Sequence, residues 1–590
     1  MLRFDEGACE GEFSVSGSRI GGRFKAAPPR VGSAGRRFSR RTLLQGISIG
    51  VGAGVTSLLN AGRTPASAAP YAMIDVLRYG VLGDGASDDR NAIQTIISTF
   101  GGLQPIYFPA GRYRIGTAGT KGPNRITLPS GTHLAFAKGA VVEVNAVDHQ
   151  PGSTILFGGG TDGTKTRLTG PATVGQAFVA LPAGETARLV VGDVVGFESD
   201  GSAGEFDPGP WHVREFHSIT SIFGDTVFLD NPLEYSYTVP DGAVFWKVET
   251  VKDITIDGAV FECGPGVNPD RDGTYAIRLT KAENFLLTNV TVRNMIGGIA
   301  IHDSYRGNVR DCTIDGLPRY GDAYGYGVHV GGSSAKINVD NLRGSDNRHL
   351  FTTLADVRGG TFWGGPMYIK VNNGIGYGTP KGYSIWDTHE FGRHIEFNNC
   401  VAMEGGSAVS GFQMRAQDIV LNNCKAQGNG LRAVVLTASS RRVDINGGDF
   451  GSAGTQGIAA AGESHRIIGA HVHDCIGAGI ALVNSKDVLI QGGSIINNLY
   501  GLQDGGRDDP GNTTINASVN AKIRDCIIPA SAKQTVSIAN LSTTAVAENL
   551  LCLGYKSMGG LFDNATDRWG APSGAAYSIM TSDGWISNPT

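Results

Sequence analysis

The chain has 590 residues, a formal net charge of −4 and 87 glycines, about twice the glycine share of an average protein. The glycines follow no Gly-x-y period, which excludes collagen, and a content of 41% hydrophobic residues excludes a chain that is disordered throughout. The first 69 residues carry a net charge of +6 and the remainder carries −10, which disfavours nucleic acid as a partner.

Residues 1–69 resemble a twin-arginine export signal with a long leader. Arg40 and Arg41 precede a glycine-interrupted apolar stretch from about Leu43 to Leu59, and the small-residue pattern Ala66-Ser67-Ala68 follows. The stretch is short for a membrane anchor, and the sequence has no second span. We therefore expect an exported protein, periplasmic or extracellular, that makes no stable insertion into a membrane.

The cysteine spacing shows neither a metal motif nor a disulfide framework. Seven of the eight cysteines follow the leader, an odd number without a Cys-x-x-Cys or cysteine–histidine zinc spacing. A chain exported in the folded state can bury its thiols before it meets an oxidising compartment. We therefore predict buried free thiols.

Residues 70–180 are predicted to form an N-terminal cap and the first coils of a repeat fold. A polar Gly/Asp loop at 79–89 precedes a helical stretch that begins near Asn91, and a strand follows at 106–113. This order resembles the N-terminal cap of pectate-lyase-like β-helix proteins, a group with polysaccharide lyases, alginate epimerases and phage tailspike depolymerases. The resemblance implies the fold and says little about the reaction.

Residues 181–250 are predicted to form a small β insertion, because strand-like stretches at 189–195 and 225–229 interrupt the repeat. The segment from Glu205 to His212 is acidic and aromatic. It is interpreted either as part of a lateral cap or as a contact for substrate.

Residues 251–528 contain the repeat itself. Apolar anchors at positions 397, 421, 445, 468 and 490 are separated by steps of 24, 24, 23 and 22 residues. Short strands with this period bury their apolar faces only by stacking coil on coil. The pattern predicts an all-β, right-handed parallel β-helix of roughly ten coils. A polar residue stands two places after many anchors and is expected to form a ladder: Asn289, Asp311, Asn341, Asn399, Asn423 and Asp525.

Two segments depart from this repeat. Residues 354–384 are predicted as an aromatic loop inserted between two coils, and such a loop would wall a groove. Residues 529–590 have weak strand patterning and are predicted to cap the C-terminal end.

The repeat also predicts which side chains face outward. The inward anchors of the second strand are taken as Ile299, Val328, Leu350, Trp386, Phe412, Val434, Ile458 and Ile480. Positions one and three places later point outward, so Asp387 should lie beside Gln413, and His389 beside Arg415, in coils about 4.8 Å apart. This numbering also places Phe351 outward, with His349 and His329 facing outward one and two coils before His389.

These residue types suit removal of the C5 proton of a uronic acid. His389 would act as base, Arg415 would neutralise the sugar carboxylate, and Asp387 would orient the histidine. The proton donor is left open between His349, His329 and a tyrosine, either from the inserted loop or among Tyr320, Tyr324 and Tyr326. Further candidate substrate-binding residues are His329, Gln413, Arg348, Glu390, Tyr326, Trp363, Lys370 and Tyr383.

The segment Asp387-Thr388-His389-Glu390 resembles the Asp-Pro-His-Asp/Glu motif of mannuronan C5-epimerases. In the periplasmic members an arginine about two dozen residues later neutralises the carboxylate, which implies this role for Arg415. The sequence departs from the motif at Thr388, which replaces proline. Tyr383 stands four residues before the aspartate, whereas the secreted members have a tyrosine three before it, so the acid stays unassigned. The calcium-binding nonapeptide repeats of the secreted members are absent from the sequence.

Several classes of function stay open. β-Elimination by a polysaccharide lyase is favoured over C5-epimerisation, which shares the first step. A glycoside hydrolase would need a second carboxyl group beside Asp387 or Glu390, with Asp322 and Asp346 as candidates. The polygalacturonase motifs are missing, and a noncatalytic carbohydrate-binding solenoid is the third alternative.

The expected partner is an acidic polysaccharide. No cofactor is required by any motif, and Asp322, Asp346 or Asp387 would be the ligands if calcium were bound, although no calcium loop is recognisable. A homotrimer, common among tailspikes, has no support in the sequence.

Overall fold

The computed structural model describes residues 73–116, 125–145, 154–201, 211–265, 267–268, 274–317, 324–358, 361–378, 383–504, 506–508, 513–515, 518–555, 561–563, 568–569, 576–581 and 584–588. The predicted export signal lies outside this range, as do Glu205, Tyr320 and Asp322. No helix in the described ranges has the length and apolar character needed to cross a membrane.

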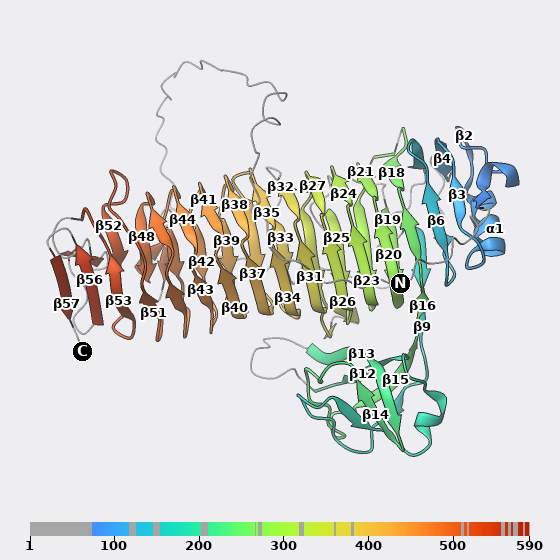
Figure 1. The fold of residues 1–590 in the computed structure, drawn as a ribbon, viewed down its shortest axis with the longest axis horizontal. Helices are drawn as coiled ribbons and strands as arrows, with labels where there is room; N and C mark the ends of the chain where they lie inside the picture. The colour runs from blue at the N-terminus through green and yellow to red at the C-terminus, as the bar shows by residue number, and fades with distance from the viewer. Residues whose placement is uncertain are drawn as a thin grey trace, which may run out of the picture. The chain divides into compact units, whose positions relative to one another are not determined.

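The described chain is almost entirely β-structure, coiled into a solenoid of about 16 turns. Each regular coil contributes one strand to each of three parallel sheets, as β34 (Arg393–Asn398), β35 (Val401–Met403) and β36 (Ser410–Met414) do. The three sheets hold 18, 13 and 15 strands, and Figure 1 shows their strands stacked side by side. The expected right-handed parallel β-helix is confirmed, and the expected number of coils was too low.

The first coils are closed by an amphipathic helix. Helix α1 (Arg90–Phe100) buries Ile93, Ile96 and Ile97, which fall on one face at helical spacing. The next strands, β3 (Ile106–Phe108) and β4 (Gly111–Ile115), already pair in parallel with later coils. The polar loop, helix and strand therefore occur in the predicted order.

The C-terminal segment continues the stack. Strands β52 (Val536–Ala539) and β53 (Val546–Leu551) pair in parallel with the coil before them. Two later strands turn back: β55 (Arg568–Trp569) pairs antiparallel with β54 (Leu561–Asp563), and β57 (Gly584–Asn588) pairs antiparallel with β56 (Ala576–Thr581). Much of the segment from 529 onward is thus additional coils rather than a cap, which partly explains the low coil count.

One turn of each coil carries the expected polar ladder. Asn289, Asn341 and Asn399 have left-handed backbone φ angles of 54°, 56° and 53°, a conformation that Asn and Asp tolerate better than other side chains. Their amides donate to the residue above: Asn289 Nδ2 to Asp257 Oδ1 at 2.8 Å, and Asn399 Nδ2 to Asn373 Oδ1 at 3.3 Å. The repeated Asn and Asp residues thus serve both the turn geometry and the contact between coils.

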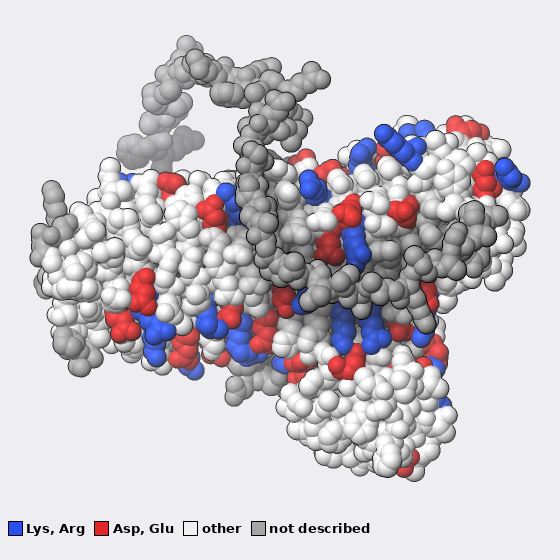
Figure 2. Space-filling view, viewed as in Figure 1, with Lys and Arg blue, Asp and Glu red and all other residues white. Residues whose placement is uncertain are grey.

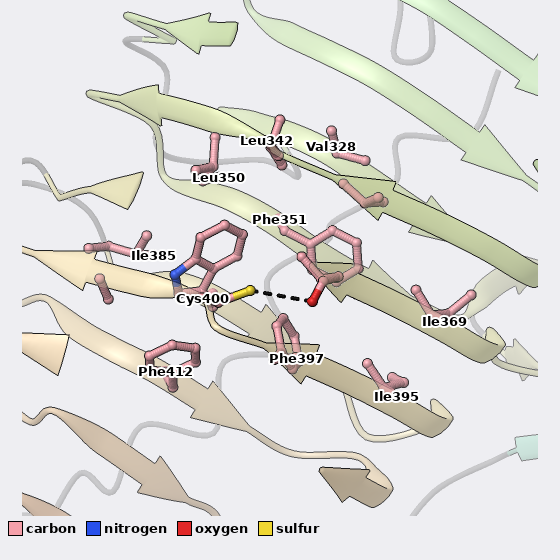
Figure 3. Close-up of a cluster of buried hydrophobic side chains, with 14 of the residues drawn as sticks. Val328, Leu342, Leu350, Phe351, Ile369, Ile385, Ile395, Phe397, Cys400 and Phe412 are labelled. Carbon is pink, nitrogen blue, oxygen red and sulfur yellow. Dashed lines mark hydrogen bonds between the residues drawn. The ribbon is translucent and has the colours of Figure 1, made fainter. Parts of the chain in front are cut away.

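The solenoid interior is a continuous apolar core, part of which is drawn in Figure 3. Phe351 pairs with Trp386, and Trp386 pairs with Phe412, so large side chains stack from coil to coil. Leu350 is buried as well, because two consecutive residues of this strand face the core. Strict alternation from Leu350 was therefore wrong here: Phe351 points inward, and Thr352 takes the outward position.

The cysteines are free thiols, as predicted: Cys312, Cys400, Cys424, Cys475, Cys526 and Cys552 are buried, and Cys263 is half-buried. Figure 3 shows the Cys400 side chain among the apolar residues, where its thiol donates to the backbone oxygen of Val371 at 3.4 Å. Burial raises the pKa of the Cys312 thiol to about 12, which keeps it protonated and unreactive.

A small β domain branches from the solenoid between Thr161 and Glu249, and thus begins earlier than position 181. Its antiparallel core consists of β12 (Val194–Ser199), β13 (Trp211–Phe223) and β15 (Val244–Glu249). Asp230 of this domain accepts hydrogen bonds from Tyr305 Oη and Lys336 Nζ of the solenoid, both at 2.6 Å.

Residues 354–384 are not a single inserted loop. Strands β31 (Met367–Asn372) and β32 (Ile375–Tyr377) belong to a regular coil. Only β29 (Asp356–Arg358) and β30 (Thr361–Trp363) leave the repeat, as a hairpin that pairs with β13 of the small domain. The aromatic residues of this segment therefore do not wall one groove.

Charged side chains of both signs are mixed along the edge of the solenoid formed by the 18-stranded sheet (Figure 2). Arg442 pairs with Asp418 at 2.6 Å and Lys370 with Glu396 at 3.1 Å, each between adjacent strands. The two charges of each pair neutralise one another.

Candidate functional site

The 15-stranded sheet presents one dense polar cluster, on β28 (His349–Leu354), β33 (Ser384–Thr388) and β36 (Ser410–Met414). The register places Asp387 beside Gln413, as the coil numbering predicts. It also places Asp387 beside Thr352, where that numbering had placed Phe351. His389 and Arg415 follow at the ends of their strands and meet the same carboxylate. The structure thus brings together four residues predicted from sequence: Asp387, His389, Gln413 and Arg415.

Asp387 is the centre of this cluster, and its side chain is fully buried. Oδ1 lies 3.2 Å from Arg415 Nη2, and Oδ2 accepts a hydrogen bond from Thr352 Oγ1 at 2.9 Å and lies 3.3 Å from His389 Nε2. Burial alone would raise the pKa of Asp387, but Arg415 and the neighbouring histidines outweigh it and hold that pKa below its usual range. Asp387 is therefore an ionised carboxylate inside the protein.

His389 and Arg415 keep part of their surface exposed, 19% and 17% of each side chain. The carboxylate of Glu390 faces both: Oε2 lies 3.6 Å from His389 Nδ1, and Oε1 lies 3.9 Å from Arg415 Nη1. Burial would raise the pKa of Glu390, but His389 and Arg415 lower it overall. The Glu390 carboxylate thus lies between an imidazole and a guanidinium, at a position that is open to solvent.

Gln413 fixes the other side of the guanidinium. With its amide oxygen turned toward Arg415, it accepts hydrogen bonds from Nε and Nη2, both at 2.8 Å. Together with Asp387, this contact holds the plane of the Arg415 side chain and leaves Nη1 toward Glu390.

His349 lies beneath the cluster rather than at its surface. Its Nδ1 donates to the backbone oxygen of Ser384 at 2.8 Å, and Nε2 lies 3.9 Å from Asp387 Oδ2. Burial lowers the pKa of His349 to about 3, so the ring stays neutral. A buried, neutral ring in these contacts fits a positioning role better than that of a proton donor.

Aromatic and basic side chains extend the cluster toward the N-terminal coils. The Tyr326 ring stacks on His349 with centroids 5.5 Å apart, and Arg348 lies over both Tyr326 and Tyr383, at 5.4 and 4.9 Å. Tyr383 is 43% exposed, so it is the member of this group most accessible to a ligand.

His329 continues the column that contains Thr352. It is buried, its Nε2 has no hydrogen-bond partner in the described part of the chain, and its ring meets that of His302 at 4.7 Å. Burial, aided by His302 and Arg278, holds the pKa of His329 well below its ordinary value.

Sequence reasoning missed the threonines. Thr388 Oγ1 accepts from the backbone N–H groups of Arg415 and Ala416 at 3.0 and 3.3 Å, and Thr353 Oγ1 accepts from His389 N at 3.1 Å. These hydroxyl groups hold the strand ends from which His389 and Arg415 project. The signal was present, because each threonine stands one coil before the residue that it holds.

Two predicted binding residues lie elsewhere. Trp363 stacks on His212 of the small domain with centroids 4.2 Å apart, and Lys370 pairs with Glu396 on the 18-stranded sheet. Tyr324 packs near Tyr275, with ring centroids 6.4 Å apart.

The cluster does not fit calcium. The Asp387 oxygens are already engaged by protein donors and cations, and Asp346 lies at a turn with a φ of 56°. Asp387 therefore offers no free carboxylate oxygen to a calcium ion.

Two family models match the chain. The model described as "Right handed beta helix region" matches residues 275–450 and 410–552, and the model described as "Rhamnogalacturonase A/epimerase, pectate lyase-like" matches residues 73–134.

Curated relatives act on polysaccharides, according to their names. A capsule K1-specific depolymerase of Klebsiella phage K64-1 is 24% identical over 299 residues, which cover 50% of this chain and 32% of the relative. Mannuronan C5-epimerase AlgE4 of Azotobacter vinelandii is 38% identical over 76 residues, which cover 12% of this chain and 14% of the relative. The chain thus spans about a third or less of the length of these relatives.

Solved structures share the fold. The tailspike gp49 of Pseudomonas phage LKA1 has a TM-score of 0.52 at 13% identity, covering 86% of this chain and 80% of that chain. The Gp54 tailspike of Acinetobacter baumannii bacteriophage AP22, solved with a capsular saccharide, has a TM-score of 0.52 at 12% identity, covering 86% and 79%. Together, the fold and the two family models show that the chain belongs to the right-handed parallel β-helix superfamily of pectate-lyase-like proteins.

Proposed function

We propose that this protein is a polysaccharide-active enzyme that removes the C5 proton of a uronic-acid residue, and that its reaction is β-elimination. The observation that carries the proposal is the buried Asp387 carboxylate, which contacts both His389 and Arg415 while these two residues stay accessible. Depolymerase and epimerase relatives support a polysaccharide as the substrate.

His389 is the proposed base. Asp387 faces its Nε2, which directs Nδ1 toward the exposed side of the cluster. A histidine oriented by a buried carboxylate presents a defined lone pair to its substrate, as general-base catalysis requires. The Nδ1 lone pair would take the C5 proton.

Arg415 is the proposed partner of the sugar carboxylate. Removing the C5 proton places negative charge on that carboxylate, and a fixed guanidinium stabilises the charge as it develops. Glu390 now occupies a position between His389 Nδ1 and Arg415 Nη1, and a uronate carboxylate that displaced Glu390 would bring C5 close to the base.

Tyr383 is the proposed proton donor for the departing sugar oxygen. It is the most exposed aromatic residue of the cluster, and Arg348 lies over its ring. A nearby cation stabilises the phenolate that remains after proton transfer. His349 and His329 are assigned positioning and binding roles instead, because both are buried and neutral.

C5-epimerisation is the second candidate, favoured by the match to the epimerase AlgE4 and by the segment from Asp387 to Glu390. It needs the same proton removal, followed by return of a proton to the opposite face. Glycoside hydrolysis fits less well, because its two carboxyl groups must both reach the sugar and Asp387 is fully buried.

The experiment is to incubate the protein with a panel of polyuronates and acidic capsular polysaccharides. β-Elimination produces an unsaturated sugar with ultraviolet absorbance, and epimerisation in heavy water places deuterium at C5. Either signal should vanish in His389→Ala and in Arg415→Ala. Lys370 is a charged residue outside the cluster, so the Lys370→Ala variant is the control and should retain the signal. New reducing ends without either signal would contradict the proposal.

Export is proposed on the residues of the leader alone. Replacing Arg40 and Arg41 with lysine should retain the protein in the cytoplasm, as measured by cell fractionation, if the leader is read as a twin-arginine signal. Export of the double variant at the level of the unaltered chain would contradict it.

A further inference from the structure

Two histidines and an aspartate stand together on the 13-stranded sheet, a different sheet from the one that carries Asp387. Asp449 begins β41 (Asp449–Gly451), and His471 and His473 belong to β44 (His471–His473) in the next coil. Asp449 pairs directly with His471, so these side chains share a face. Potential ligand atoms of all three residues lie within 4.8 Å of one another.

The His473 ring is held in an orientation that suits metal binding. Its Nδ1 lies 2.7 Å from Asp474 Oδ2, and the other oxygen of Asp474 accepts a hydrogen bond from Asn497 Nδ2 at 2.6 Å. A carboxylate that takes one ring N–H and leaves the other nitrogen as a lone pair is the usual support of a metal-binding histidine. That second nitrogen, Nε2, lies 2.9 Å from Asp449 Oδ1.

Gly451 makes room for this arrangement. A Cβ atom at position 451 would lie 2.5 Å from Cε1 of His473, so the imidazole occupies the space that any larger residue would fill. His471 stacks on His473 with ring centroids 4.7 Å apart, and its Nδ1 lies 2.5 Å from Ser494 Oγ. Both imidazoles are thus held at Nδ1 by a neighbouring side chain.

The tautomer of His473 decides whether its contact with Asp449 holds a proton. In the neutral tautomer whose Nδ1–H donates to Asp474, Nε2 has only a lone pair, and Gln427 Nε2 lies 3.1 Å from it. That lone pair faces a carboxylate oxygen 2.9 Å away, which places two acceptors against each other. A cation between them would turn this repulsion into two bonds.

We propose that Asp449, His471 and His473 bind a divalent transition-metal ion, with zinc as the best match for two imidazoles and one carboxylate. Ligands at zinc distances stand about 3.3 Å apart in a tetrahedron, so the 2.9 Å pair needs only a slight opening. Lys425 Nζ lies 2.9 Å from Asp449 Oδ2 and leaves Oδ1 to the metal. The three side chains are half-exposed, so water completes the coordination, and the ion ties two neighbouring coils together.

The test uses the full chain without a histidine tag, treated with a chelator and then dialysed. Calorimetric titration with zinc should show one ion bound per chain, and cobalt should give the visible absorption of a tetrahedral nitrogen–oxygen site. The variants Asp449→Asn and His473→Gln should each lower zinc affinity at least tenfold. Asp474→Asn, which changes a support of His473 and no proposed ligand, should lower it by about 10- to 100-fold.

His133→Gln, at a half-buried histidine of β6 (His133–Phe136), is the matched control and should bind zinc as the unaltered chain does. Two results would overturn the proposal: the folded chain binds no zinc, or an Asp449→Asn/His473→Gln double variant binds it with unchanged affinity. The second result would place the ion elsewhere, and the first would mean that a protonated His473 alone satisfies Asp449. Neither depends on the polysaccharide reaction.

Discussion

His389 Nε2 lies 3.3 Å from Oδ2 of Asp387, a carboxylate whose side chain is fully buried. The other oxygen of that carboxylate lies 3.2 Å from Arg415 Nη2. A single buried anion therefore orients both an imidazole and a guanidinium, and each of these keeps a part of its surface open. The roles proposed for His389 and Arg415 both depend on it.

Replacing Asp387 with asparagine should therefore disable the enzyme while nearly preserving the shape of the side chain. The amide cannot stabilise a cationic His389, and it weakens the hold on Arg415. We expect kcat to fall roughly 10²- to 10⁴-fold. Asp418→Asn, which breaks a surface pair with Arg442, is the control and should leave kcat unchanged. Full activity of Asp387→Asn would rule out its orienting role.

Thr388 should be needed for its hydroxyl group rather than for its shape. Thr388→Val leaves two backbone N–H groups, of Arg415 and Ala416, without their acceptor, at a cost of about 1–3 kcal/mol for each buried group. We expect a lower Tm and a raised KM, because Arg415 begins from this strand end. Thr388→Ser keeps the acceptor and should restore both values. Equal values for the valine and serine variants would contradict this.

Stability should fall as the pH drops below neutrality. Burial lowers the pKa values of His302 and His465 to about 4 and that of His349 to about 3, whereas the unfolded chain protonates these residues near pH 6.5. Between pH 6.5 and 4 the unfolded state thus binds more protons, and each histidine costs about 1.4 kcal/mol of stability per pH unit. Stability is fully present above pH 6.5.

Denaturant unfolding followed between pH 7 and 4.5 tests this dependence. His465 lies outside the Asp387 cluster, where it contacts Ser440 and Val443. The slope of the unfolding free energy against pH gives the number of protons taken up on unfolding. His465→Asn should reduce that number by about one, whatever its effect on stability at pH 7. A slope equal to that of the unaltered chain would show that His465 does not contribute.

Alanine and glycine variants at a position of the turn ladder should differ in stability. Asn399 has a φ of 53°, so Asn399→Ala loses an amide contact and also forces an alanine into the left-handed region, at a cost of about 1–2 kcal/mol. Asn399→Gly loses the same contact without that strain and should be the more stable variant. The reverse order of Tm values would contradict the role of backbone conformation at this turn.

Much of the fold could be predicted from the sequence because the repeat is periodic. The step of 22 to 24 residues, the Asn and Asp turn residues and the pairing of Asp387 with Gln413 all follow from stacking equivalent positions. The error at Leu350 has a local cause: two consecutive residues of that strand face the core, and strict alternation cannot show this.

The rest could not be predicted because it depends on contacts between coils and with the small domain. Trp363 lies on a hairpin that pairs with the small domain, and the repeat pattern does not predict this hairpin. The depth of Asp387 and His349 also escapes sequence reasoning, because both occupy outward positions yet are covered by their neighbours. Their burial depends on longer side chains above them, including Arg415 and Tyr326.

The proposed reaction begins with removal of the C5 proton of the uronic acid. The most direct measurement follows a polyuronate labelled with deuterium at C5 while the protein acts on it. We predict release of the label to water during turnover, lost in His389→Ala, for either elimination or epimerisation. Polymer cleavage with the label retained at C5 would mean hydrolysis and would contradict the account.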